Sequence, residues 1–343
     1  MLSALVEKAR LEVATVKATV DIYESVRSQA YPPPNNSGAA GGGAGGTHGL
    51  PVVPPYSSWK VYDHCAAYTK LYAIWEGFVR NLVGSWLARL PSLYSGYSEL
   101  PERVRKGHSH GVAVVLARAA SPRHRHLSEL NMLEGLHSGL SGKADYTLLP
   151  EAFFHDGQNL KDDTLEQLLS RLSLTKPWEW IGRQEAMIDY MGNVRGGSST
   201  PRSELRDLVK RRNEASHGEV GEVVSSQELK KVADYVTILC EATASFVTRA
   251  LLDRMLVVGR AGEVGKVIHA YSDNLVEISL TRGVLRVGER VFALRVHECI
   301  DALAIGLQVN GMNVAQVAGG EGVVVGVRMS RRVHLHSRLA LIP

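Results

Sequence analysis

Cysteine is scarce in this chain of 343 residues, which contains only three. Cys65, Cys240 and Cys299 lie far apart in sequence and form no Cys-x-x-Cys pair, so no disulfide framework is indicated. Long hydrophobic runs are also missing, because no apolar stretch approaches the ~20 residues that a bilayer requires. The first residues carry charges throughout, unlike a signal peptide. These absences favour a cytoplasmic protein with three buried thiols and no membrane partner.

A nucleotide-binding loop is absent as well. The motif Gly-x4-Gly-Lys-(Ser/Thr) does not occur, and the nearest stretch, GLSGKAD, lacks both its first glycine and its Ser/Thr. Charged residues make up 22% of the chain, hydrophobic residues 45%, and the formal net charge is +4, all ordinary for a soluble globular protein. The length indicates two domains, since a single core rarely grows past ~250–300 residues.

Hydrophobic periodicity divides the first three quarters of the chain. Residues 1–30 repeat apolar side chains at steps of three and four, which predicts an amphipathic helix that packs on the same protein or on a dimer mate. Residues 31–56 are rich in Gly and Pro and predict a disordered linker. Residues 57–256 carry long helical patterns that end with expected helices at 201–217 and 226–256. These patterns predict an all-α bundle.

The period changes near residue 257. Short β-branched runs follow, separated by Gly, Asn and Asp, and Asn310-Gly311 is the strongest hairpin turn. Strands at this spacing, with no helix between them, predict a small antiparallel β-barrel over 257–343. The predicted fold class is therefore multidomain α and β, with an N-terminal all-α helical bundle followed by a small antiparallel β-barrel.

A basic cluster occupies residues 101–126, with six Lys/Arg, one acid and four histidines. Such a cluster attracts polyphosphate, although a solvated basic surface around a short helix has the same composition. No Cys or acidic ligand stands beside the histidines, so no metal and no other cofactor is predicted. The nucleic-acid contacts predicted from this region are Arg103, Arg105, Lys106, Arg123 and Arg125.

One residue of the expected helix at 201–217 does not fit the amphipathic pattern of that helix. Its apolar stripe includes Leu208 and Val209, and one further step along the stripe falls on Arg212. A guanidinium on a half-buried stripe is costly unless a carboxylate, a phosphate or a partner interface meets it. Lys210 and Arg211 point elsewhere and are also predicted to contact nucleic acid.

His217 follows Arg212 by five residues, which places the two about 140° apart around a helix. Asn213 precedes His217 by four residues and shares its face, so it can orient the ring. An imidazole can exchange a proton near neutral pH. Together with a guanidinium that stabilises a crowded phosphate, it is the minimum set for metal-free RNA cleavage by the 2′-hydroxyl, which DNA lacks.

The run RRNEASHG resembles the HEPN superfamily, whose hallmark is Arg, a polar residue, three variable residues and His. Arg212, Asn213 and His217 match that motif position by position, between a long helix with an internal glutamate and a final long helix. A Gly-x-Asn turn that ends at Asn159 also resembles some members. The resemblance covers about residues 58–255.

The resemblance implies a metal-independent endoribonuclease of toxin–antitoxin, anti-phage or RNA-processing systems. Its partners would be RNA, a second copy that brings two motifs together across a two-fold axis, and a cognate antitoxin. It also implies an acidic residue near the arginine, for which Glu76 is our candidate. Some members bind without cleaving, so an RNA- or ribosome-binding adaptor and a purely regulatory protein stay open. In a further alternative, Arg212 only ties to Glu76 and His217 caps a helix.

The second domain has a resemblance of its own. A Leu-x-Val-Gly-Glu turn at 285–289 and a Gly-rich step at 318–320 resemble the second, β-barrel domain of translational GTPases. Those barrels touch the ribosome or tRNA, so the resemblance implies a targeting module. A generic barrel that contacts a protein partner or the bundle is the alternative.

Overall fold

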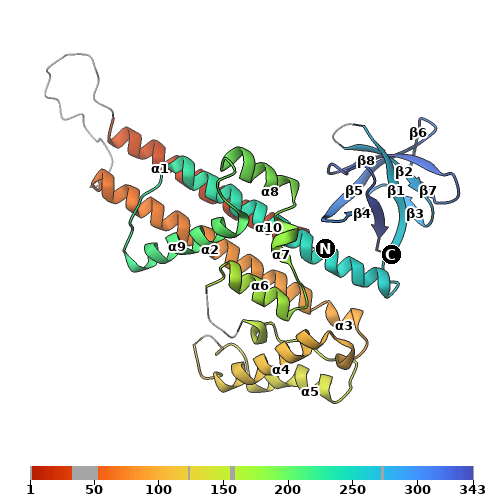
Figure 1. The fold of residues 1–343 in the computed structure, drawn as a ribbon, viewed down its shortest axis with the longest axis horizontal. Helices are drawn as coiled ribbons and strands as arrows, with labels where there is room; N and C mark the ends of the chain where they lie inside the picture. The colour runs from red at the N-terminus through yellow and green to blue at the C-terminus, as the bar shows by residue number, and fades with distance from the viewer. Residues whose placement is uncertain (1, 33–52, 123, 155–158, 272–273, 343) are drawn as a thin grey trace, which may run out of the picture.

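The computed structural model describes residues 2–32, 53–122, 124–154, 159–271 and 274–342 (Figure 1). Most of the predicted linker, and the predicted contact residue Arg123, lie outside these ranges. The described chain folds into a helical bundle followed by a β-barrel, so the predicted fold class is confirmed.

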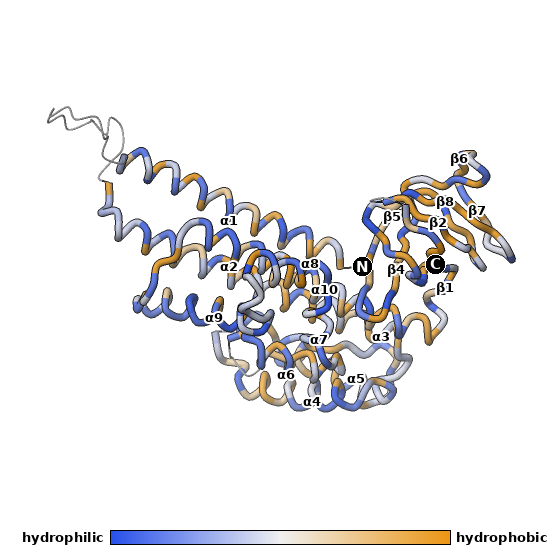
Figure 2. Tube along the Cα trace, turned by 45° about the horizontal axis from the view of Figure 1, so that its top comes forward, coloured by the Kyte–Doolittle hydropathy of each residue, from blue (hydrophilic) through white to orange (hydrophobic). Residues whose placement is uncertain are grey.

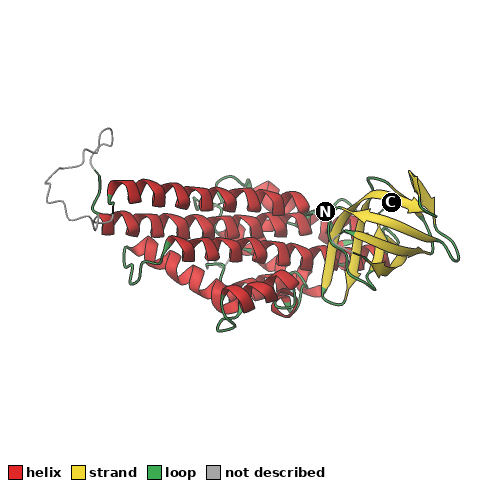
Figure 3. Cartoon of the chain, turned by 90° about the horizontal axis from the view of Figure 1, so that it is seen from above, coloured by secondary structure: helices red, strands yellow, loops and turns green. Residues whose placement is uncertain are grey.

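Four long helices run side by side in the bundle, and the barrel sits at one end of them (Figure 3). They are α1 (Ser3–Ala30), α2 (Tyr56–Leu87), α9 (Pro201–His217) and α10 (Ser226–Val257). The shorter helices are α3 (Leu90–Leu93), α4 (Glu102–Ala117), α5 (Glu129–Leu140), α6 (Asp162–Arg171), α7 (Pro177–Ile181) and α8 (Glu185–Asp189), with single turns η1 (Tyr97–Glu99), η2 (Pro150–Phe153) and η3 (Tyr190–Val194).

Helix α2 is the centre of the bundle, because α1, α9 and α10 all pack against it. Its aromatic stripe is fully buried, with Tyr68, Tyr72 and Trp75 each at most 2% exposed. Burial of such rings contributes most of the favourable free energy of a helical core. Figure 2 shows apolar positions recurring along the trace of the long helices, and the buried apolar residues of α2 and α10 belong to one core cluster.

Helix α1 is held to the bundle by charge as well as by its apolar stripe. Arg27 forms a buried ion pair with Asp63 of α2. Lys17 donates to Asp234 of α10 at 2.7 Å. The helix therefore packs on its own chain, one of the two places that its periodicity allows.

Within the described ranges, α10 is the one helix that is long and apolar enough to cross a bilayer, and 61% of its most apolar stretch is buried inside the protein. Burial of that kind is what the core helix of a bundle shows.

The barrel is antiparallel and closed. Six strands form a ring in the order β4-β9-β1-β2-β8-β5, and β5 pairs back onto β4, which removes the open edges. A hairpin at Asn310-Gly311, where both residues have positive φ, adds β6 to β5. The strands are β1 (Gly262–Ala270), β2 (Leu275–Leu280), β3 (Val284–Arg286), β4 (Arg290–Arg295), β5 (Glu298–Val309), β6 (Met312–Val314), β7 (Gln316–Ala318), β8 (Val324–Met329) and β9 (Arg338–Leu341).

A small apolar cluster joins the two domains. Trp180 of α7 and Leu252 of α10 pack with Phe292 of the barrel, and all three are buried. Ser245 of α10 also donates to the Cys299 carbonyl at 3.1 Å. The barrel is thus anchored on the end of α10 rather than tethered by a loop alone (Figure 1).

Candidate functional site

Helix α9 positions the Arg-Asn-x3-His motif. The helix starts with Thr200 and Ser203 in a capping box and with Pro201 at its first position. It ends at Gly218, whose φ of 75° favours a residue without a Cβ. The apolar side of α9, including Leu208, is buried against α2. These constraints fix which way the last turn faces.

Neutral groups hold Arg212 in place. Its guanidinium carbon lies 4.7 Å from the centre of the Tyr72 ring. Its Nη1 donates to Oδ1 of Asn213 at 3.1 Å and to Oδ1 of Asn159 at 3.3 Å. The Asn159 amide in turn donates to Asn213 Oδ1 at 3.0 Å. The two asparagines and the ring leave the guanidinium little freedom to turn.

The charge of Arg212 is not neutralised by the residues that the structure describes. Among them, no carboxylate lies within ion-pair distance of the guanidinium, and its buried Nε has no hydrogen-bond partner. A half-buried guanidinium with these properties has a strong tendency to bind an anion.

His217 and Asn213 line one open groove of about 390 Å³. His217 is exposed, and within the described ranges its ring makes no hydrogen bond. The remaining lining residues are Lys161, Arg206, Val209, Lys210, Glu214 and Glu219, which give three cations against two carboxylates. Arg212 does not line this groove, because it turns toward α2. Asn213 and His217 therefore share a face and Arg212 lies on another, but the Asn213 side chain accepts from Arg212 and Asn159 rather than orienting the His217 ring.

Glu76 is not brought to Arg212. It accepts instead from Arg80, one turn further along α2, at 2.7 Å. The alternative in which Arg212 serves only to tie α9 to Glu76 is wrong for this chain, because asparagines and Tyr72 hold the guanidinium. The role of Glu76 as a site residue stays a prediction.

The two basic neighbours of Arg212 have intramolecular partners. Arg211 donates to Asp207 at 3.0 Å and to Glu222 at 3.2 Å. Lys210 lies 3.8 Å from Glu214 and faces the groove. Of these two, Lys210 is the one placed to meet a ligand of the groove.

The basic cluster is not a continuation of the α9 site, because α4 packs on η2, α5 and α6. Arg103 donates to Ser170 at 2.9 Å, Arg105 to the Leu100 carbonyl at 3.1 Å, and Lys106 pairs with Glu102 at 2.7 Å. Arg125 is exposed. Their contact with nucleic acid stays a prediction.

His108 belongs to the core rather than to a basic surface. It is 1% exposed, lies 3.1 Å from the Tyr97 hydroxyl through Nδ1, and accepts from the Leu149 amide at 3.0 Å through Nε2. Burial lowers the pKa of His108 to about 4, so the ring is neutral at pH 7. Within the described residues, no three His, Cys, Asp or Glu side chains gather as a metal site.

Sequence reasoning missed Tyr72 and Asn159 as the groups that hold Arg212. Tyr72 lies on the apolar face of a long helix, and Asn159 was considered only as part of a turn. A buried tyrosine whose hydroxyl accepts from the Leu160 amide at 2.8 Å ties that turn to α2, and so brings Asn159 to α9. Such a relation between three segments leaves no pattern in the sequence.

The fold and the site together define a helical domain that presents an Arg-Asn-x3-His motif at the end of its penultimate helix. The model of the MAE_28990-like HEPN family matches residues 6–254. The chain therefore belongs to this HEPN family, and the match runs from α1 into α10. A comparison with curated proteins gives no significant match.

Proposed function

We propose that this protein is a metal-independent endoribonuclease that cleaves RNA through attack of the 2′-hydroxyl on the adjacent phosphodiester. The observation that carries the proposal is the half-buried charge of Arg212, which described neutral groups orient and no described carboxylate compensates. Asn213 connects this guanidinium to the groove that holds the exposed imidazole of His217. HEPN domains are commonly nucleases, which agrees with this chemistry.

In the proposed reaction, His217 takes the proton from the 2′-hydroxyl as the 2′-oxygen–phosphorus bond forms. Arg212 stabilises the negative charge that builds on the phosphoryl oxygens. The phosphorus–5′-oxygen bond then breaks, and a proton from a second acid neutralises the departing alkoxide. The products are a 2′,3′-cyclic phosphate and a 5′-hydroxyl, so no metal is needed to generate a nucleophile.

A homodimer supplies that second acid in our proposal. One α9 presents His217 and Arg212 on different faces, so a cleft between two copies would gather both groups around one phosphate. The biological setting that we propose is a cytoplasmic toxin or defence effector, held in check by a cognate antitoxin.

Cleavage of total RNA in EDTA tests the proposal. The His217→Ala and Arg212→Ala variants should each lose about 10²–10⁴-fold in rate. His137→Ala is the matched control, because His137 is also exposed and also lies in the last turn of a helix, α5. Cleavage that survives both α9 substitutions would refute the site. Cleavage that needs a divalent metal would refute the mechanism. RNA binding without any turnover would favour the adaptor.

A further inference from the structure

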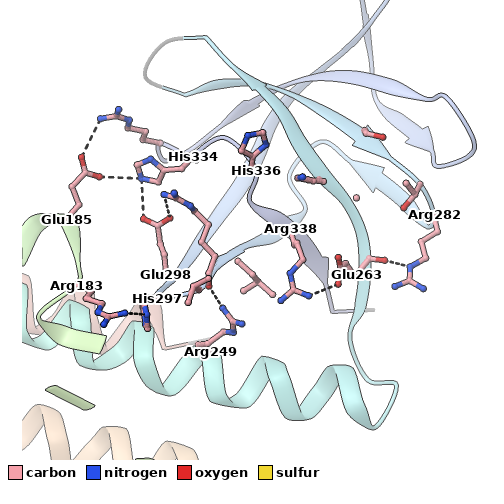
Figure 4. Close-up of a pocket in the computed structure, with 18 of the residues that line it drawn as sticks. Arg183, Glu185, Arg249, Glu263, Arg282, His297, Glu298, His334, His336 and Arg338 are labelled. Carbon is pink, nitrogen blue, oxygen red and sulfur yellow. Dashed lines mark hydrogen bonds and ion pairs between the residues drawn. The ribbon is translucent and has the colours of Figure 1, made fainter. Parts of the chain in front are cut away.

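A second and larger cavity lies where the barrel meets the bundle. It has a volume of about 1400 Å³ and separates the β1, β4, β5 and β9 side of the barrel from α8 and α10 (Figure 4). We call it the interdomain cleft. Seven of its lining residues are Arg or Lys, three are Glu and three are His. The charge of its walls is therefore clearly positive, whereas the chain as a whole is only mildly basic.

The walls of the cleft are fixed to each other. Gln184, beside α8, donates to the His297 carbonyl of the barrel at 2.6 Å. Arg183 contacts the His297 ring, and Arg249 of α10 donates to the Arg295 carbonyl (Figure 4). These links, together with the apolar cluster under Phe292, hold the two walls at a set spacing.

The three carboxylates of the cleft hold basic side chains in place but do not neutralise the net positive charge of the cleft. Glu263 accepts from Arg338 at 3.1 Å, and Glu185 lies 3.8 Å from Arg332. Glu298 is set between His334, at 3.2 Å, and Arg295. Each guanidinium in these pairs keeps further N–H donors for a ligand.

Two basic side chains of the cleft are open to solvent. Within the described residues, Lys266 of β1 forms no ion pair. Arg332, after β8, is 69% exposed, and among the described carboxylates it pairs only with the exposed Glu185. An anion can approach both of them at little desolvation cost.

We propose that the interdomain cleft binds the sugar-phosphate backbone of RNA, apart from the groove on α9. This inference rests on the proposed function, which makes RNA the substrate. The cleft exceeds the ~300–1,000 Å³ of small-molecule pockets, and its cations are spread over both walls, as in grooves that follow a nucleic-acid backbone. No Phe, Tyr or Trp is among the described lining residues, so the three histidines are the only aromatic rings that this lining offers to bases. The cleft would hold phosphates and leave sequence unread.

The test is RNA binding by the full chain carrying His217→Ala, which keeps the probe intact. The probe is a labelled, unstructured single-stranded RNA of about 30 nucleotides, titrated by fluorescence anisotropy in EDTA over a salt series. The cleft variant is Lys266→Ala/Arg332→Ala. Its matched control, Lys8→Ala/Arg331→Ala, removes the same charge from exposed positions outside the cleft, and Arg331 is the direct neighbour of Arg332.

The cleft variant should bind about tenfold more weakly, and the slope of log K against log salt should shrink by about 1.4, since each lost phosphate contact is worth about 0.7 on a single strand. The control should stay within about twofold of its parent. The charge-preserving Lys266→Arg/Arg332→Lys variant should retain affinity, which separates loss of charge from loss of fold.

Equal affinities of the cleft variant and the control would overturn the inference, and so would a parent protein that does not bind RNA. Calorimetric binding of tripolyphosphate that depends on Lys266 and Arg332, without a matching effect on RNA, would also overturn it in favour of a small anion. Failure of the nuclease proposal would give a different set of results. In that case RNA binding still responds to the cleft variant, but no variant with His217 intact cleaves in EDTA.

Discussion

The α9 groove and the interdomain cleft both offer positive charge, yet they are built differently. The groove is about 390 Å³, and beside it Arg212 is held by two asparagines and the face of Tyr72. The cleft is about 1400 Å³, and its Arg332 meets a carboxylate only at the edge of ion-pair range. Chemistry at a single phosphate requires one guanidinium in one orientation, whereas holding a long polyanion requires only enough charge along its path.

Among the predictions that distinguish the α9 groove from the interdomain cleft, we expect the largest effect from Arg-to-Lys substitutions. Arg212→Lys should lower the single-turnover cleavage rate in EDTA by about 10²–10³-fold, because an ammonium cannot reproduce the planar contact with Tyr72 and both asparagines. Arg332→Lys should leave RNA affinity within about twofold, because only its charge matters there. A cleavage rate for Arg212→Lys within tenfold of wild type would show that α9 also works by charge alone.

Low pH complicates the comparison, because it lowers the stability of the fold and also affects proton transfer in the α9 groove. Burial holds the pKa of His108 at about 4 in the folded state, below the ordinary histidine value of about 6.5. The unfolded chain therefore binds the extra proton between these values. The stability that His108 contributes is complete above about pH 6.5 and is lost as pH falls toward 4, by roughly 3 kcal/mol.

His108→Gln tests this prediction by urea unfolding at neutral pH and near pH 4.5. The variant should be less stable at neutral pH, since it disturbs the hydrogen bonds to Tyr97 and Leu149, but it should lose less stability on acidification. Equal acid losses in variant and wild type would assign the acid sensitivity to other groups. The comparison matters because cleavage profiles below about pH 6 would otherwise mix unfolding with proton transfer in the groove.

The smallest effect should come from Asn159→Ala. Asn159 acts through Arg212, so its loss should lower kcat about tenfold and leave both KM and RNA affinity near the wild-type values. Asn159→Asp, which sets a carboxylate beside the guanidinium, should lower kcat further because it competes with the phosphate. Weaker RNA binding with an unchanged rate would mean that Asn159 contacts the substrate instead of positioning Arg212.

Local patterns predicted the parts of the fold that local interactions determine. The bounds of α9 at residues 201–217 and the shared face of Asn213 and His217 both follow from neighbouring residues in one helix. The strands of the barrel follow from the change of period near residue 257, and the β5–β6 hairpin from the turn at Asn310, whereas closure joins β9 to the distant β1 and β4.

The remaining contacts join segments that are distant in the chain. The family resemblance made Glu76 the candidate for an acidic residue near Arg212, but Glu76 accepts a hydrogen bond from Arg80, four residues further along the same helix. His108 stands in a basic run and yet is buried, because α4 turns it onto Tyr97 and Phe153. The cleft draws its cations from segments of both domains, and the basic run RRVHLHSR at 331–338 is a local signal for it in the sequence.

The central claim, that the 2′-hydroxyl of the substrate is the nucleophile, is tested most directly by one altered linkage. Once a cleavage site in an RNA oligonucleotide has been mapped, the same oligonucleotide is made with a single 2′-deoxy residue on the 5′ side of that bond. Both are incubated with wild-type protein in EDTA. Our account predicts that the all-RNA strand is cut to a 2′,3′-cyclic phosphate and that the altered linkage stays intact. Cleavage of the deoxy linkage at the same rate would contradict it.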